Sequence, residues 1–315
     1  MSAPGAAQIR RRRVNKDNPY SPIQKRHHWW RAILHTGAGG AEFAPYVPCG
    51  KKCYCGASWL CKMITETIRF PNGRIARLVW VSPETPPDAW LAALDLGSPR
   101  ALIVVCGGAG GMSAEEIEAV RPLMVDGLAR LAAREQIAVL DGGTNSGVMA
   151  LIGEGAAHHG LTAPLIGVCP AAKVSWPGNL NPRAEAELEP HHSHFVLTPG
   201  EEFGAETEFL YALAGALGAR LPSLALLING GPIALRETWL NVRQRRPLVV
   251  FRGSGRAADV IAAAQEKGES GDPLVAEIIR CGDVTIFDVR EGPESLIQLI
   301  RSKLWEEKHG QSGYF

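Results

Sequence analysis

Residues 101–111 read ALIVVCGGAGG, and residues 137–149 read IAVLDGGTNSGVM. Each stretch begins with an uninterrupted apolar run and ends in a glycine-rich turn. A continuous apolar run of roughly 4–8 residues is typical of a strand that is buried on both faces of a parallel sheet. We therefore expect two neighbouring parallel strands, each followed by a loop and a helix.

The same alternation of strand and helix continues along most of the chain. Further strands are predicted at residues 77–81, 165–169, 194–198, 224–228, 248–251 and 284–287. Helices are predicted at residues 86–94, in a stretch ending at 135 whose long part starts at Pro122, and at 147–159, 203–217, 233–244, 256–267 and 294–304. Strands that alternate with helices require right-handed crossovers. The predicted fold class is α/β, a Rossmann-like, doubly wound parallel sheet with helices on both faces.

One folded domain is expected, at residues 65–308. Before it lie a basic tail at residues 1–31 and an irregular cysteine- and glycine-rich cap at residues 32–64, and residues 309–315 form a short C-terminal tail. The formal charge is +7 over residues 1–31 and +1 over the whole chain, which leaves about −6 for the remainder. An acidic body argues against a nucleic-acid partner.

The composition is that of a soluble globular protein, with 46% apolar and 21% charged residues. No apolar run approaches the roughly 18 residues that a membrane span needs. The N-terminus has no secretion signal. We therefore expect a cytoplasmic protein without a membrane span.

The seven cysteines fall into two groups. Cys106, Cys169 and Cys281 lie in or beside apolar segments and are expected to be buried. The others, Cys49, Cys53, Cys55 and Cys61, could hold zinc through four thiolates. Their spacing lacks the paired C-x2-C knuckles of zinc sites, so reduced structural cysteines are the favoured interpretation and no required metal or cofactor is expected.

Glycines gather where five of the predicted strands end, and the carboxyl ends of parallel strands share one edge of the sheet. Glycine lets the backbone approach a ligand closely, and the helix starts beyond such loops favour phosphate. Five glycine-rich loops on one edge therefore indicate a nucleotide or phosphate site. The residues expected to line it are Gly107, Gly108, Ala109, Gly142, Gly143, Thr144, Asn145, Ser146, Gly147, Gly200, Gly204, Gly230, Gly231, Gly253, Ser254 and Gly255.

A nicotinamide dehydrogenase is the rival interpretation. Its G-x-G-x-x-G fingerprint is not satisfied, because Gly108-Ala109-Gly110 is followed at the last position by Ser113. Asp141 does end the second strand, where a ribose-binding carboxylate would stand, but it follows the first glycine by 34 residues and precedes two more glycines. The spacing therefore disfavours a dehydrogenase.

Several motifs in order resemble the SLOG superfamily. They are GGTNSGV at residues 142–148, HSHF at 192–195, GAE at 204–206, GGP at 230–232 and GSGRAAD at 253–259. The match is closest to its LSDAT branch, which comprises the N-terminal cytosolic region of melastatin-type TRP channels and prokaryotic relatives. More distant members are the LOG, lysine-decarboxylase-like hydrolases and the Smf/DprA proteins.

The resemblance implies roles for individual residues. In the channel branch the arginine that matches Arg256 belongs to an ADP-ribose-binding pocket, and a guanidinium pairs bidentately with phosphate. In the LOG hydrolases the position matching Glu208 carries a catalytic glutamate, but the surrounding motif departs here and no R-K-x-x-M segment supplies a partner arginine. Glu206 could bind ribose hydroxyls or only cap its helix. His192, His194 and Asp259 are possible pocket residues.

The histidines also admit a metal interpretation. His191, His192 and His194 include an H-x-H pattern, but no carboxylate or thiol stands at ligand spacing. We therefore expect them to form hydrogen bonds at the mouth of the strand at 194–198.

The leading hypothesis is a ligand-sensing domain for a nucleotide-derived small molecule of the ADP-ribose or NAD-derived class. The alternative is a LOG-type nucleotide N-glycosidase or phosphoribohydrolase that uses Glu208. Nucleic-acid binding is a third, disfavoured class, and a homo-oligomer or an effector partner stays open.

Overall fold

The computed structural model describes residues 64–306. The basic tail, the cap with its four cysteines and the C-terminal tail therefore lie outside the described residues, apart from Ile64. Among the described residues, no helix combines the length and the apolar character that crossing a membrane would require.

The strands and helices alternate as predicted. The strands are β1 (Thr65–Arg69), β2 (Ile75–Trp80), β3 (Ala101–Gly107), β4 (Ile137–Asp141), β5 (Leu165–Pro170), β6 (Val174–Ser175), β7 (Ala186–Glu187), β8 (His194–Thr198), β9 (Ser223–Ile228), β10 (Leu248–Arg252) and β11 (Val284–Asp288). The α-helices are α2 (Pro87–Leu94), α3 (Ala114–Pro122), α4 (Arg130–Glu135), α5 (Gly147–His158), α6 (Thr207–Gly218), α7 (Pro232–Arg243), α8 (Arg256–Lys267), α9 (Pro273–Cys281) and α10 (Gly292–Arg301). Two π-helical segments, η2 (Leu123–Ala129) and η5 (Ser302–Glu306), and two short 3-10 turns, η3 (Ala171–Lys173) and η4 (Val289–Glu291), complete the described elements.

Nine strands form one sheet in the order β1-β2-β8-β5-β4-β3-β9-β10-β11. All neighbours pair in parallel except β1, which pairs with β2 in antiparallel fashion at the edge. The predicted doubly wound α/β fold is therefore confirmed. β1 was not predicted because only Ile68 of its five residues is buried, so the strand has no apolar run.

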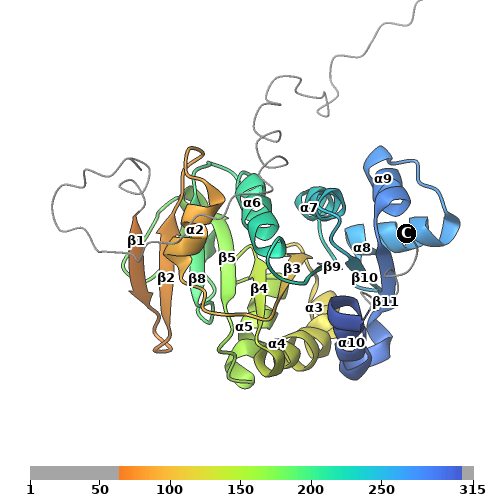
Figure 1. Ribbon diagram of the computed structural model, residues 1–315, viewed down its shortest axis with the longest axis horizontal. Coiled ribbons are helices and arrows are strands. Elements are labelled where there is room, and N and C mark those ends of the chain that lie inside the picture. The colour runs from red at the N-terminus through yellow and green to blue at the C-terminus, as the bar shows by residue number, and fades with distance from the viewer. Residues whose placement is uncertain (1–63, 307–315) are drawn as a thin grey trace, which may run out of the picture. The chain divides into compact units, whose positions relative to one another are not determined.

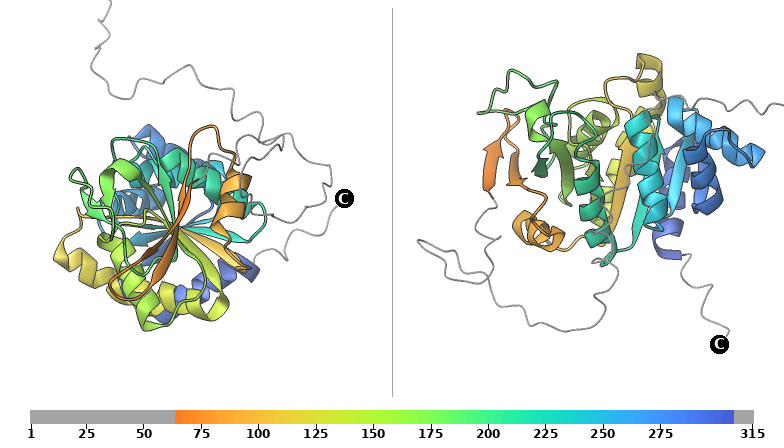
Figure 2. Two further views of the ribbon diagram at one scale, coloured as in Figure 1. Left: turned by 90° about the vertical axis from the view of Figure 1, so that its left-hand side faces the viewer. Right: turned by 90° about the horizontal axis from the view of Figure 1, so that it is seen from above.

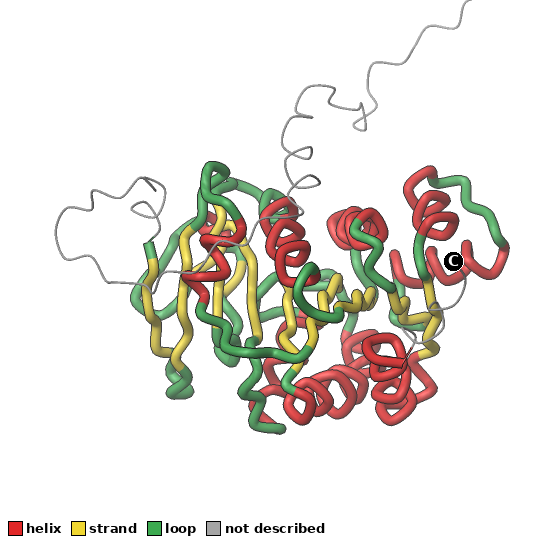
Figure 3. Tube along the Cα trace, in the orientation of Figure 1, coloured by secondary structure: helices red, strands yellow, loops and turns green. Residues whose placement is uncertain are grey.

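Helices cover both faces of the sheet (Figures 1 and 3). Side chains of α2, α6, α7, α8 and α9 pack in one apolar core, and side chains of α3, η2, α4, α5 and α10 pack in the other. Seen along the sheet from the β1 side, the strands fan out with the twist expected of an open sheet (Figure 2). A third, smaller core lies under the segment that links β5 to β8, and includes Phe70, Trp176 and Phe195.

Three local predictions were wrong. Pro122 does not open a helix; it ends α3, and the chain continues with the wider π winding of η2, consistent with a proline that removes one donor from the ladder. Helix α9 was missed, although Asp272 and Pro273 form a start signal: the Asp272 carboxylate accepts hydrogen bonds from the amides of Leu274 (2.8 Å) and Val275 (3.2 Å). Cys281, at the end of α9, is exposed, whereas Cys106 and Cys169 are buried as expected.

Candidate functional site

The chain changes direction across the sheet at β3, which lies between β4 and β9. From β3 it passes through α3, η2 and α4 on one face to β4, whereas α6 on the other face leads from β8 to β9. In an open parallel sheet, ligands bind outside the carboxyl ends of the strands at such a reversal. We call this position, bordered by the loops at residues 107–112 and 229–231, the switch point.

Arg256 extends its side chain across the switch point. A β-carbon built on Gly111 would lie 2.9 Å from Nη1 of Arg256, and one built on Gly231 would lie 2.8 Å from Nη2. The guanidinium therefore lies between the loop after β3 and the loop after β9. It is exposed, and no hydrogen bond or ion pair joins it to any residue of the described chain. A cation held this way between two backbone loops is suited to an anionic group.

The turn that carries Arg256 is held by internal hydrogen bonds. The carboxylate of Asp259 accepts from the amides of Gly253 (2.6 Å) and Gly255 (3.1 Å). The Ser254 hydroxyl is buried, donates to the Phe251 carbonyl (2.6 Å) and accepts from the Asn229 amide (2.7 Å). These groups shape the turn, so an anion at this helix start would meet the Arg256 side chain rather than the amide of Gly255.

Helix α8 is also tied to the loop after β9. The amides of Ala257 and Ala258 donate to the carbonyls of Gly230 (3.2 Å) and Asn229 (3.0 Å). Arg256 itself has φ of 50° and Asn229 has φ of 57°, a left-handed backbone that is uncommon outside glycine. The loop after β9 and the turn before α8 are thus joined by hydrogen bonds, and together they fix the position of the Arg256 guanidinium.

Most glycines of the loops after β3 and β4 are required for packing. A β-carbon on Gly107 would lie 2.1 Å from a methyl group of Val148, and one on Gly147 would lie 2.1 Å from the Gly108 carbonyl oxygen. The Val148 amide donates to that same carbonyl (3.0 Å), so the start of α5 is closed by the β3 loop. Gly142, in contrast, faces open space. The two predicted motifs therefore contact each other directly.

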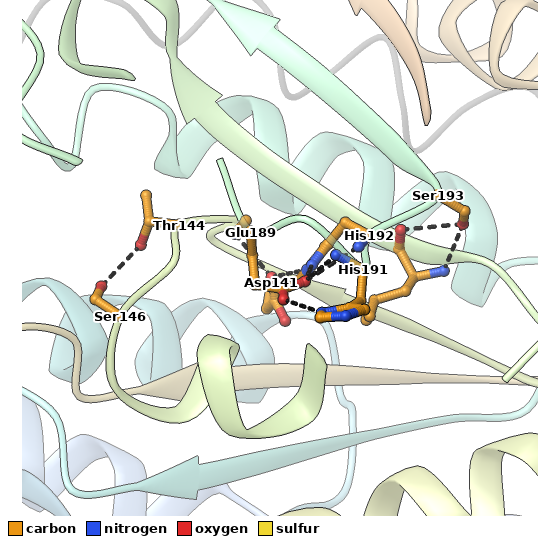
Figure 4. Close-up of polar contacts among 9 residues, drawn as sticks. Asp141, Thr144, Ser146, Glu189, His191, His192 and Ser193 are labelled. Atoms are coloured by element: carbon orange, nitrogen blue, oxygen red, sulfur yellow. Dashed lines mark hydrogen bonds and ion pairs between the residues drawn. The ribbon is translucent and has the colours of Figure 1, made fainter. Parts of the chain in front are cut away.

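A buried charge cluster lies where β4 ends (Figure 4). The Nε2 atom of His192 lies 2.9 Å from Oδ1 of Asp141, and its Nδ1 atom lies 2.7 Å from Oε2 of Glu189. All three side chains are buried. His191, which is partly exposed, lies 2.7 Å from the other oxygen of Glu189. From the sequence, His192 was a possible pocket residue and Asp141 entered only the disfavoured dehydrogenase interpretation. Glu189 was not predicted, because it stands in an irregular segment without any periodic signal.

The cluster holds a charged imidazole. Burial alone would lower the pKa of His192, but the charges and hydrogen bonds of Asp141 and Glu189 outweigh it and raise this pKa to about 9. Despite the opposing effect of burial, the hydrogen bond and charge of His192 hold the pKa of Glu189 below its usual range. At neutral pH one imidazolium is therefore shared by two buried carboxylates.

This cluster fastens the GGTNSG loop to the sheet. Oδ1 of Asp141 also accepts from the amide of Gly143 (2.7 Å), and the Glu189 amide donates to the Gly143 carbonyl (2.9 Å). A β-carbon on Gly143 would lie 2.7 Å from the Cα atom of Gly167, so the loop lies directly against β5. At its far end the hydroxyl groups of Thr144 and Ser146 are 3.1 Å apart (Figure 4).

Asn145, which lies between Thr144 and Ser146 in this motif, lines a pocket of about 380 Å³. Its walls are mostly apolar and come from the β1–β2 turn and from the segment between β5 and β8, including Phe70, Trp176 and Leu188. Neither segment borders the switch point. The structure therefore places Asn145 in a pocket that Arg256 does not line.

Acidic groups line the start of α6. Glu206 is buried, and its carboxylate accepts from the amide of Gly204 (2.7 Å). Burial raises the pKa of Glu206 and raises that of Glu237 on α7 to about 8, with the Glu206 charge adding to the latter shift. Glu208 forms an ion pair with Arg236 of α7 (2.6 Å), in which both side chains are half exposed. The arginine that the sequence analysis missed beside Glu208 thus comes from another helix.

His194 lies at the amino end of β8, as the first residue of the strand. Its Nδ1 atom is 2.8 Å from the Ser193 hydroxyl. Burial and the charge of Arg77 lower the pKa of His194 to about 4. The expectation that His194 lines a pocket at the strand mouth does not fit this position, because the mouth lies at the other end of β8.

The family described as "SLOG in TRPM, prokaryote" matches residues 100–298, more than half of the 315 residues. This span runs from β3 into α10 and contains both the switch point and the buried cluster. The chain belongs to this family. The resemblance predicted from the GGTNSGV, HSHF and GSGRAAD motifs is thereby confirmed.

Known channels match this SLOG chain at low identity. It is 25% identical to a Nematostella vectensis transient receptor potential cation channel subfamily M member-like 2 over 264 residues, and 27% identical to human subfamily M member 7 over 237 residues. These matches cover 68% and 63% of this chain but 17% and 12% of the two channels. Mouse subfamily M member 2 is 25% identical over 230 residues, 60% of this chain and 15% of the channel. The chain thus corresponds to a small part of each relative.

Proposed function

We propose that this SLOG chain binds a nucleotide-derived ligand at the switch point and acts as a ligand sensor. The observation that carries the proposal is the Arg256 guanidinium, which lies between Gly111 and Gly231 with no partner in the described chain. Its exposed charge stands where open parallel sheets bind ligands. A phosphate of the ligand would pair with this guanidinium, because its fork matches two phosphate oxygens.

The ligand class follows from the resemblance to the channel branch, in which the matching arginine belongs to an ADP-ribose pocket. The carboxylates around the start of α6 fit the ribose part of such a ligand. They would repel a phosphate, which is why we assign the phosphate to Arg256. Glu206 instead offers oxygen atoms that accept hydrogen bonds from ribose hydroxyls. We therefore propose ADP-ribose or a related NAD-derived nucleotide as the ligand, with no required cofactor.

The experiment is a thermal-shift and calorimetric titration with ADP-ribose, NAD and AMP. A ligand at ~100 times its Kd adds roughly 2.7 kcal/mol to the stability of the folded state, which raises Tm by several degrees for a domain of this size. Arg256→Ala should weaken a phosphate-bearing ligand by roughly 10- to 100-fold. Arg256→Lys should restore only part of the affinity, because an ammonium group cannot form the bidentate pair.

Arg245→Ala is the matched control. Arg245 is also exposed, also has a left-handed φ (55°) and follows α7, at the end opposite the switch point. Its removal should leave ligand affinity unchanged. Arg252 is less suitable, because it pairs with Asp288 (3.1 Å) and with Glu266. Equal losses for Arg256→Ala and Arg245→Ala, or no shift of Tm with any nucleotide at millimolar concentration, would overturn the proposal.

A second candidate function is a LOG-type N-glycosidic hydrolase. The ion pair between Glu208 and Arg236 favours it, because it supplies an arginine beside the glutamate that matches the catalytic position. Incubation with nucleotides separates the two functions: a sensor leaves its ligand intact, whereas a hydrolase releases a free base or a ribose phosphate that mass spectrometry detects.

A further inference from the structure

A second group of possible ligating side chains lies on the other face of the sheet from α6 and α7. Asp126 of η2 and the adjacent His158 and His159 at the end of α5 bring one carboxylate oxygen and two imidazole nitrogens within 4.8 Å of one another. Nothing in the switch point or the buried cluster involves these residues. We call them the Asp126–His158–His159 group.

The backbone brings these three residues together. A β-carbon on Gly155 of α5 would lie 2.5 Å from Cβ of Ala129 and 2.9 Å from Cα of Val125, so α5 and η2 approach each other almost backbone to backbone. Gly155 stands one helical turn before the two histidines. The partner of α5 in this contact is η2, a seven-residue π-helix, and π-helical turns often occur at functional sites.

One distance within the group matches the separation of two ligands around one ion. Nε2 of His159 lies 3.2 Å from Oδ1 of Asp126. Two ligand atoms that are each about 2.0–2.1 Å from a tetrahedral zinc ion lie about 3.3 Å apart. The rings of His158 and His159 are stacked, with centroids 4.6 Å apart and planes 16° apart. Because His158 is exposed, its ring can turn to direct a nitrogen at the same ion.

We propose that the Asp126–His158–His159 group binds a divalent transition-metal ion of the zinc class. Two imidazoles and one carboxylate are borderline donors that suit Zn²⁺, and water would complete the coordination shell. The site lies at the carboxyl end of α5, where the helix dipole favours a cation. A bound ion would fasten the end of α5 to η2, and the opposite end of α5 carries the GGTNSG loop.

The test titrates the full chain with Zn²⁺ by calorimetry and with Co²⁺ by visible absorption. The expected result is one ion bound with a Kd in the micromolar range, with visible d–d bands from this ion. Thiolate ligands add a near-ultraviolet charge-transfer band, so a Co²⁺ ion on the cysteines outside the described residues would be recognised by its spectrum. Zn²⁺ should also raise Tm, since it binds the folded state preferentially.

Asp126→Asn, His158→Gln and His159→Gln should each weaken this ion by at least tenfold and abolish its share of the Tm increase. Glu154→Gln is the matched control. Glu154 is an exposed carboxylate on α5, the helix that ends at His158, but it pairs with Arg121 and lies outside the group. Unfolding in the presence of a chelator shows whether each variant is folded. Binding that is equal in the parent and in all three variants, or that appears only at millimolar metal, would overturn the proposal.

Discussion

Removal of the buried imidazolium should be among the most destabilising single changes in the domain. In His192→Leu, the carboxylates of Asp141 and Glu189 stay buried, and both lose their partner at 2.9 and 2.7 Å. Breaking a buried ion pair by removing one member costs about 3–5 kcal/mol, because an uncompensated charge is left in a poorly solvated place. For a domain of this size each kcal/mol lowers Tm by about 2–4 °C. We expect Tm to fall by roughly 6–20 °C.

The pH dependence gives an independent measure of the same contacts. The pKa of His192 rises from 6.5 to about 9 on folding. A raised pKa means that the stabilisation is complete below pH 6.5 and is lost as the pH rises from 6.5 through 9. A shift of this size corresponds to about 3 kcal/mol. The stability difference between the parent chain and His192→Leu should therefore shrink over this pH range.

The assay is urea unfolding followed by circular dichroism at pH 6, 7.5 and 9. His191→Leu is the control: this neighbouring histidine contacts the same Glu189 from a partly exposed position, and its loss should cost under about 1 kcal/mol. Adding Asp141→Asn to His192→Leu should recover part of the stability, since it removes one of the two stranded charges. A loss below 1 kcal/mol for His192→Leu, or a pH-independent difference from the parent, would refute the reasoning.

Two further predictions concern the loops. Glu208→Gln should leave nucleotide affinity within about twofold in calorimetry, because its carboxylate is engaged with Arg236; loss of a measurable hydrolysis rate by orders of magnitude in this variant would instead establish the hydrolase. Gly147→Ala should lower stability by at least about 2 kcal/mol in chemical unfolding, because φ is 53° and the new β-carbon would lie 2.1 Å from the Gly108 carbonyl oxygen. Gly142→Ala meets open space, and equal costs for the two alanine variants would contradict the packing argument.

The sequence by itself predicted the elements whose signal is local. Apolar runs such as 101–106 and 137–140 mark strands wherever a sheet buries both faces, and these strands lie in the sheet as expected. β1 was missed because an edge strand with one buried residue carries no such run. The glycine-rich loops were placed on one edge because parallel strands must end on the same side.

Only the tertiary structure decided which partners those residues meet. His192 meets Glu189 and also Asp141, which lies 51 residues earlier in the sequence, and Arg236 meets Glu208 from the next helix. The position of Arg256 between Gly111 and Gly231 likewise depends on three loops that are remote in sequence.

Periodicity and spacing report on the burial and backbone freedom of single segments, whereas ion pairs depend on side chains that different segments direct into one place. For this reason the sequence could predict that the glycine-rich loops share one edge of the sheet, but not the charge network that fastens the GGTNSG loop to it.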